Sequence, residues 1–183
     1  MPSIISHPAV TLALKPFFQK FKIPLWITLL GAFCTIIPDF DVIGFAFDVE
    51  YESMLGHRGI THSLFFAAVL SGLIVLSLKD SKQISKPACF VFLFLCTASH
   101  GFFDALTSGG HGVAFFAPFY NERFFFPWQP IRVSPIGVKR FLTSRGLVVL
   151  TSEFFWVWIP SLFAGLCGML WNRLSEAKVK NDG

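Results

Sequence analysis

The sequence predicts an all-α fold: a polytopic helical bundle in a membrane, with about four spans, a short or partly inserted N-terminal helix and a long outer loop. Composition and hydropathy predict this class. Hydrophobic residues make up 54% of the 183-residue chain and charged residues only 14%, and the mean hydropathy is +0.62. A soluble domain of this length could not bury so much apolar surface. We therefore expect residues 1–183 to form a single membrane-embedded domain.

Four apolar segments are long enough, or nearly so, to cross a bilayer. They run from Pro24 to about Gly44, from Ser63 to Leu78, from Pro87 to Leu106 and from Leu147 to Trp171. A span needs about 20 residues, so the first two segments are marginal. The first is also interrupted by Pro38, Asp39 and Asp41.

Two further segments complete the expected architecture. Ile4 to Phe21 is apolar but contains Lys15 and Lys20, which favours an interfacial or partly inserted helix. Ser108 to Arg145 is rich in Gly, Pro, Phe and Arg and predicts a long loop. A loop of that length in a compact protein is more often functional than idle.

The basic residues indicate an orientation. Nine lie on one side of the expected spans: Lys15, Lys20, Lys22, Lys79, Lys82, Lys86, Arg173, Lys178 and Lys180. Six lie on the other side: Arg58, Arg123, Arg132, Lys139, Arg140 and Arg145. The positive-inside rule favours the nine-residue side as cytoplasmic. Because these cations are scattered at the ends of apolar segments, we expect the lipid bilayer and not nucleic acid as the partner.

Histidine and aspartate residues converge on the opposite, outer side of this topology. They comprise Asp39 and Asp41 at the outer end of the first span, His57 and His62 at the outer entrance to the second, and His100 and Asp104 near the outer end of the third. His7 joins them if the N-terminal segment dips into the bilayer and turns at Lys20 and Lys22. Scattered structural polar residues would be divided between the two sides, whereas agreement among three spans is expected of a shared functional site.

The chemistry of these side chains points to a divalent metal. Imidazole and carboxylate suit zinc, manganese or iron, and the four cysteines stand singly in apolar runs. His100 and Asp104 are one helical turn apart, so both can aim at one ion. We expect one or more ions, with zinc favoured. The alternative is a set of buried, hydrogen-bonded residues that seal helix ends, although neutral side chains would do so at a lower desolvation cost.

Four motifs carry a resemblance to a known family. They are Pro-Asp-Phe-Asp at 38–41, Gly-His-Arg-Gly-Ile-Thr-His-Ser at 56–63, Ser-His-Gly-Phe-Phe-Asp-Ala-Leu-Thr-Ser-Gly-Gly at 99–110 and Glu-Arg-Phe-Phe-Phe-Pro-Trp-Gln-Pro-Ile-Arg-Val-Ser-Pro at 122–135. In this order, and over nearly the whole chain, they resemble the YdjM-like family of bacterial membrane-bound, metal-dependent hydrolases. The His and Asp pattern is similar, more distantly, to zinc-dependent phospholipase C and S1/P1-type nucleases.

The resemblance implies a ligand set and leaves other roles open. The implied metal ligands are His7, Asp39, His57, His62, His100 and Asp104. Asp41 is a further ligand, a partner that orients a histidine, or the general base. Arg58 clamps an anionic oxygen, or it only caps a helix or pairs with Asp39 or Asp41.

Two more ionisable residues have open roles. His111 lies in a Gly-Gly-His-Gly turn and is more readily explained as a loop residue than as a ligand. Glu153 either faces the bundle and pairs with an arginine of the long loop, or lies near the water interface.

The expected function is metal-dependent hydrolysis at the bacterial inner membrane, with the site facing the periplasm. The substrate would be an ester, favoured as a phosphoester of a lipid or another anionic molecule, attacked by metal-activated water. The alternative is a non-enzymatic metal-binding membrane protein or a transporter. A transport pathway needs polar groups through the full depth of the membrane, and the inner halves of the second and third spans are apolar.

Overall fold

The described part of the chain, residues 2–79 and 84–181 of a computed structural model, is helical with connecting loops and contains no strand, which confirms the predicted class. Lys82, one of the basic residues counted above, lies outside this part. The α-helices are α1 (Ala9–Leu14), α2 (Leu25–Cys34), α3 (Leu64–Ser77), α4 (Lys86–Ala105), α5 (Val138–Phe141), α6 (Ser144–Glu153) and α7 (Ile159–Asn181). Three 3₁₀ helices, η1 (Lys15–Phe21), η2 (Ile37–Phe47) and η3 (Ile60–His62), and a π-helical turn, η4 (Phe154–Trp158), continue or join them.

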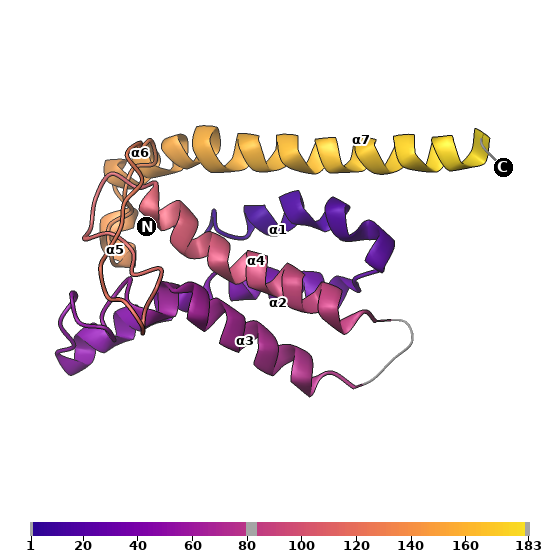
Figure 1. The fold of residues 1–183 in the computed structure, drawn as a ribbon. Coiled ribbons are helices and arrows are strands. Elements are labelled where there is room, and N and C mark those ends of the chain that lie inside the picture. Colours follow the sequence, from indigo (N-terminus) through magenta and orange to yellow (C-terminus); the bar gives the residue numbers. More distant parts are fainter. Residues whose placement is uncertain (1, 80–83, 182–183) are drawn as a thin grey trace.

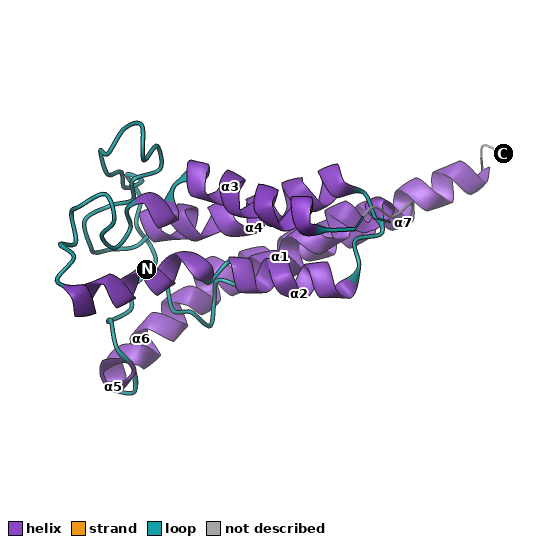
Figure 2. Ribbon diagram, turned by 90° about the horizontal axis from the view of Figure 1, so that it is seen from below, coloured by secondary structure: helices purple, strands orange, loops and turns teal. Residues whose placement is uncertain are grey.

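The helices form one elongated bundle (Figures 1 and 2). Helix α4 packs against both α2 and α3, and α1 packs against α7. The long loop between α4 and α5 and the short helix α5 lie at one end of the bundle, and α7 extends beyond the other helices at the opposite end. Buried side chains of α2, α3 and α4, among them Ile27, Val75 and Phe92, form the main apolar core.

Three helical segments are long and apolar enough to cross a membrane: Leu25–Phe47, Lys86–Ala105 and Ser144–Lys178. The predicted second span, α3, has only 14 residues. At 1.5 Å per residue it is about 21 Å long, which is less than the roughly 30 Å of a bilayer's hydrocarbon core. The bundle therefore has three full-length candidate spans and one short apolar helix.

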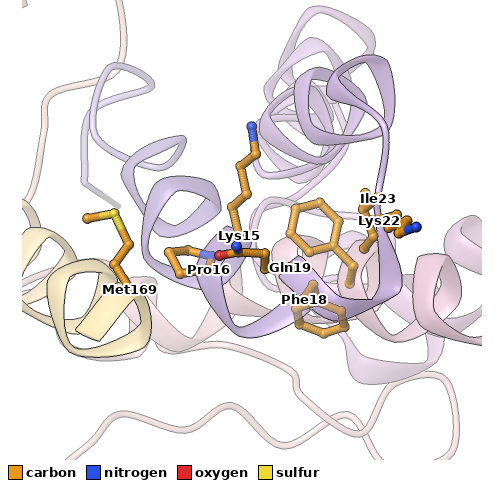
Figure 3. Close-up of a pocket in the computed structure, with 8 residues that line it drawn as sticks. Lys15, Pro16, Phe18, Gln19, Lys22, Ile23 and Met169 are labelled. Carbon is orange, nitrogen blue, oxygen red and sulfur yellow. The ribbon is translucent and has the colours of Figure 1, made fainter. Parts of the chain in front are cut away.

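The N-terminal segment lies alongside α7. Helix η1 ends at Phe21. The next residue, Lys22, has a φ of 51°, in the left-handed region, and the chain then turns back into α2. Glycine permits the close approach of η1 to α7, because a Cβ at Gly168 would lie 2.9 Å from Cβ of Pro16. A cavity of about 300 Å³ lies here. Figure 3 shows Lys15, Pro16 and Phe18 of η1 and Met169 of α7 among the residues that line it.

The break in the first span has a local cause. Pro38 has no backbone N–H and its ring is incompatible with a continuing α-helix, so α2 gives way to η2. The backbone N–H of Asp39 then donates to the carbonyl of Ile36 (3.1 Å). In an unbroken α-helix it would have donated to the carbonyl of Thr35. The break therefore releases the Thr35 carbonyl for another partner.

The long loop is tied to the loop end of the bundle by backbone hydrogen bonds. The Phe126 N–H donates to the Ala105 carbonyl (3.0 Å), and Ile131 both donates to Leu106 (3.2 Å) and accepts from Ser108 (2.9 Å). These bonds cap the end of α4, which carries His100 and Asp104. The loop is therefore part of the wall around these residues.

Candidate metal centre

Four of the predicted ligands meet at the loop end of the bundle. They are Asp39 from η2, His62 from η3, and His100 and Asp104 from α4, and all four are buried. One ligand atom from each lies within 4.8 Å of the corresponding atoms of the other three. Three segments that are distant in sequence therefore contribute to one compact cluster.

The separations within this cluster match those of ligands around one small ion. The Nε2 atoms of His62 and His100 are 3.1 Å apart, and His100 Nε2 lies 3.2 Å from Asp39 Oδ1. His62 Nε2 lies 3.5 Å from an Asp104 oxygen and 3.8 Å from Asp39 Oδ1. Ligand atoms about 2.0–2.2 Å from a tetrahedral ion lie about 3.3–3.6 Å from one another. His100 Nε2 lies 4.0 Å from the nearest Asp104 oxygen, so the separations of the cluster scatter around those of a tetrahedral site.

Hydrogen bonds at the far ring nitrogens orient both histidines. His100 Nδ1 lies 2.7 Å from the Thr35 carbonyl, the group released by the break at Pro38. A carbonyl only accepts, so Nδ1 carries the proton and Nε2 presents a lone pair to the cluster. His62 Nδ1 contacts an Asp41 oxygen at 3.2 Å, and this contact directs the Nε2 atom of His62 into the cluster as well. This arrangement, ring N–H to oxygen and free nitrogen inward, is typical of metal-binding histidines.

The cluster concentrates negative charge in a buried place. Burial alone would lower the pKa of His62, but the carboxylates of Asp104, Asp39 and Asp41 outweigh it and raise that pKa to about 10. Without a metal, a proton on His62 balances part of the negative charge of these carboxylates. Both carboxylate oxygens of Asp39 are buried without a hydrogen-bond partner in the described part of the chain. Such atoms are rare in native proteins unless an ion or water serves them, so the donor set fits a divalent cation.

His7 joins the cluster at its edge, as expected if the N-terminal segment turns at Lys22. Its ring stacks on His100 at 3.9 Å between centroids, and its Nε2 lies 4.0 Å from an Asp104 oxygen. Burial, and then the neighbouring His100, lower the pKa of His7 to about 3, so the ring is neutral. Neither of its nitrogens has a hydrogen-bond partner among the described residues. His7 is therefore available as a further ligand or as a proton acceptor.

Asp41 and His57 form a second group beside the first. Asp41 accepts from His57 Nδ1 (2.6 Å), from the Thr61 hydroxyl (2.7 Å) and from the backbone N–H of Arg58 (3.2 Å). With His62 these two residues make a second set of three spaced for a metal. The Asp41 carboxylate contacts both histidine rings, which is the orienting geometry considered for it from sequence.

Arg58 is buried and its side chain is engaged inside the protein. Its Nε lies 3.0 Å from Asp104, and its terminal nitrogens donate to the Gly109 carbonyl and the Thr107 hydroxyl, both at 2.9 Å. Its φ of 64° is unusual for a residue with a side chain. These bonds hold that conformation, and Arg58 neutralises part of the charge of the cluster. The side chain pairs with Asp104 and not with Asp39 or Asp41, the partners considered from sequence.

The remaining ionisable residues lie elsewhere. His111 is exposed and pairs with Glu52 at 2.8 Å, away from the cluster. Arg123, from the long loop, donates to the backbone carbonyls of His57 and Tyr51, so it holds the loop that carries His57. Glu153 is fully buried and faces the bundle, but its partners are not arginines of the long loop.

Glu153 instead holds the N-terminal segment. It accepts hydrogen bonds from the backbone N–H of Ser3 and from the hydroxyls of Ser3 and Ser6, the last two at 2.6 Å. The Ser6 hydroxyl in turn accepts from the Trp158 indole at 3.0 Å. Ser6 directly precedes His7, so this clamp fixes the residue beside the cluster. Sequence reasoning missed this role, because the partners are 147 and 150 positions apart.

Gly101 was also missed as a residue that shapes the site. A Cβ at this position would lie 2.7 Å from the backbone carbonyl of His62. Only glycine allows α4 and the His62 backbone to come this close. The Ser-His-Gly motif thus places a candidate ligand, His100, next to the glycine that lets the His62 backbone approach.

Comparison with known proteins agrees with the motif resemblance. The family model of the YdjM inner membrane protein matches residues 1–177. The chain belongs to the YdjM family. It is also 40% identical over 173 residues to the inner membrane protein YbcI of Escherichia coli strain K12, covering 94% of this chain and 99% of YbcI. No solved structure shows significant similarity to the chain.

Proposed function

We propose that this YdjM-family chain is a metal-dependent hydrolase of the bacterial inner membrane that cleaves phosphoesters, with its site facing the periplasm. The observation that carries the proposal is the buried set of Asp39, His62, His100 and Asp104, whose ligand atoms all lie within 4.8 Å of one another. The inner-membrane location is supported by the names of the family and of the YbcI relative. The nine basic residues at the opposite ends of the spans, against six on the side of the site, support the periplasmic orientation.

In the proposed reaction, the elements of water are added across a P–O bond, so that an alcohol and a phosphate group are released. A divalent ion, with zinc favoured, would supply Lewis-acid stabilisation of anionic oxygen and would lower the pKa of water towards neutrality. The protein's own residues hold and orient the four donors. Asp41 and the Thr35 carbonyl fix the histidine rings, and Arg58 fixes Asp104.

Two residues are suited to proton transfer. The neutral ring of His7 has unpartnered nitrogens at the edge of the cluster, and His57 forms a tight pair with Asp41 (2.6 Å). A histidine oriented by a carboxylate is a common general base. We expect Asp41 and Arg58, which were candidates for direct catalytic roles, to act as positioning residues, because their polar atoms contact other protein groups.

The test is hydrolysis by purified, full-length protein. We expect release of product from a phosphomonoester or phosphodiester panel, loss of the activity with a chelator, and its return with Zn²⁺ or Mn²⁺. His62→Ala should remove the activity, whereas His111→Ala, which alters an exposed histidine away from the site, should not. A metal-loaded, folded preparation that hydrolyses none of the panel, yet carries metal ions across vesicle membranes, would favour the transporter alternative.

A further inference from the structure

An apolar pocket of about 440 Å³ opens beside Asp39. Its walls come from four places. They are Ile4 and Ile5 of the N-terminal segment, Phe40 and Val42 of η2, Ser134 and Pro135 of the long loop, and Val138 and Phe141 of α5. Its volume is within the range of small-molecule sites, about 300–1,000 Å³. The cavity of Figure 3, in contrast, lies by η1 and α7 and contains none of the cluster residues.

Asp39 connects this pocket to the candidate metal centre. Asp39 is one of the residues that line the pocket, yet it is only 4% exposed, and both of its carboxylate oxygens lack a hydrogen-bond partner among the described residues. Asp39 Oδ1 is also 3.2 Å from His100 Nε2. A molecule in the pocket would therefore lie against a residue of the cluster. Among the described residues, Asp39 is the only acidic one in the lining of the pocket.

The exposed residues of the pocket are apolar, and basic residues follow them in sequence on α5. Ile4, Ile5, Phe40 and Val138 are each about half exposed or more, at 49%, 53%, 47% and 74%. Next to Val138, Lys139 and Arg140 are exposed on α5. Apolar side chains beside cations, at the end of a membrane bundle, are typical of a surface at the level of the lipid headgroups. This combination suits a ligand with a hydrocarbon chain and an anionic group.

We propose that the pocket admits an acyl chain of an anionic phospholipid from the bilayer and thereby selects lipid phosphoesters as substrates. This inference rests on the proposed hydrolase function. The acyl chain of the lipid lies between η2, α5 and the N-terminal segment, and the phosphate group of the lipid reaches the cluster at Asp39. Lys139 and Arg140 attract the anionic headgroup at the mouth. The substrate enters sideways from the membrane and not from water.

The test measures lipid binding apart from turnover. Full-length, metal-loaded protein is placed in phosphatidylcholine vesicles with a trace of phosphatidate carrying a photoreactive diazirine on its acyl chain. After irradiation, adducts are mapped by mass spectrometry. We expect them on the peptides that contain Ile4 and Ile5 and on those that contain Val138 and Phe141, and we expect unlabelled phosphatidate to compete. A diacylglycerol probe with the same chain should label these peptides less.

A matched pair of variants tests the pocket itself. Val42→Trp puts a larger side chain into the pocket. If this excludes about two methylene groups of the acyl chain, we expect a roughly tenfold loss of labelling. Ile43→Trp alters the neighbouring residue, which is 59% exposed and does not line the pocket, and should leave labelling unchanged. Val138→Asp changes an exposed residue at the mouth, so it lowers labelling by repulsion without requiring the core to adapt.

The outcomes separate this inference from the proposed function. Adducts spread evenly over the lipid-facing helices, or labelling that neither Val42→Trp nor Val138→Asp reduces, would overturn the pocket as a lipid site. Hydrolysis of soluble phosphoesters without pocket labelling would support the hydrolase function and contradict the lipid site. Pocket labelling without any hydrolysis would support the lipid site and contradict the hydrolase function.

Discussion

The Nε2 atoms of His62 and His100 face each other at 3.1 Å, each with its Nδ1 directed at an oxygen acceptor. Two neutral imidazoles in this arrangement would point lone pairs at one another, so a positive charge has to lie between them or beside them. In the metal-free protein this is the proton of His62. Because the carboxylates of Asp39 and Asp104 lie on either side, we propose a divalent ion as the occupant of this site.

Metal content should depend on this set of four. We expect purified protein to contain bound zinc or a similar ion, and His100→Ala or Asp104→Ala to lose most of it while still inserting in the membrane, because apolar partitioning holds the spans. Elemental analysis by mass spectrometry measures the content. His111→Ala is the control. Full metal content in both site variants would mean that these residues are structural.

Replacing Gly101 should disturb the site without removing a ligand. In Gly101→Ala the new Cβ meets the His62 carbonyl at 2.7 Å, so the two ligand-bearing segments must move apart. We expect metal affinity to fall by about tenfold or more, as is usual when ligand orientation is lost. Gly72→Ala in α3 is the matched control, since its nearest neighbour would be 3.9 Å away. Equal affinities in the two variants, measured by competition with a chelating dye, would refute the close-approach argument.

Asp41 should tune metal binding from outside the four-donor set. Asp41→Asn retains the shape of the side chain but removes the charge that orients His62 and His57. We expect a loss of about 10- to 100-fold in metal affinity, with the ion still bound at saturating concentration. Asp48→Asn, an exposed aspartate at the end of η2, serves as the comparison. Loss of the ion even at saturation would instead identify Asp41 as a ligand.

Glu153 should stabilise the N-terminal segment that carries His7. Glu153→Ala leaves the Ser3 and Ser6 donors without their acceptor, and we expect it to lower the free energy of unfolding by about 2 kcal/mol. Hydrogen exchange should increase at residues 3–8 in particular. Glu176→Ala alters an exposed glutamate farther along α7 and should change neither quantity. Unchanged exchange at residues 3–8 would show that the clamp does not hold the segment.

The orientation of the bundle can be tested with fusions. A reporter inserted in the loop between Asp48 and Ser53 should map to the periplasm, and one placed after Lys178 should map to the cytoplasm. This loop lies at the same end as the cluster, so its location is also that of the site. A cytoplasmic signal from the reporter in this loop would contradict a periplasmic location of the site.

The membrane class and the approximate spans could be predicted from sequence because hydropathy is a sum over local residues and does not depend on packing. The convergence of Asp39, His62, His100 and Asp104 was predictable for a related reason. Once the chain crosses the membrane, successive span ends alternate between the two sides, so topology alone places these residues at one end.

Only the tertiary structure decided which atoms meet. The Thr35 carbonyl orients His100 because Pro38 breaks the helix, and the Arg58 side chain pairs with Asp104 because the long loop and α4 meet it on two sides. Glu153 reaches Ser3 and Ser6 across nearly the whole chain. Such contacts depend on how helices pack and on which donors lie within about 3 Å, and neither periodicity nor motif spacing contains that information.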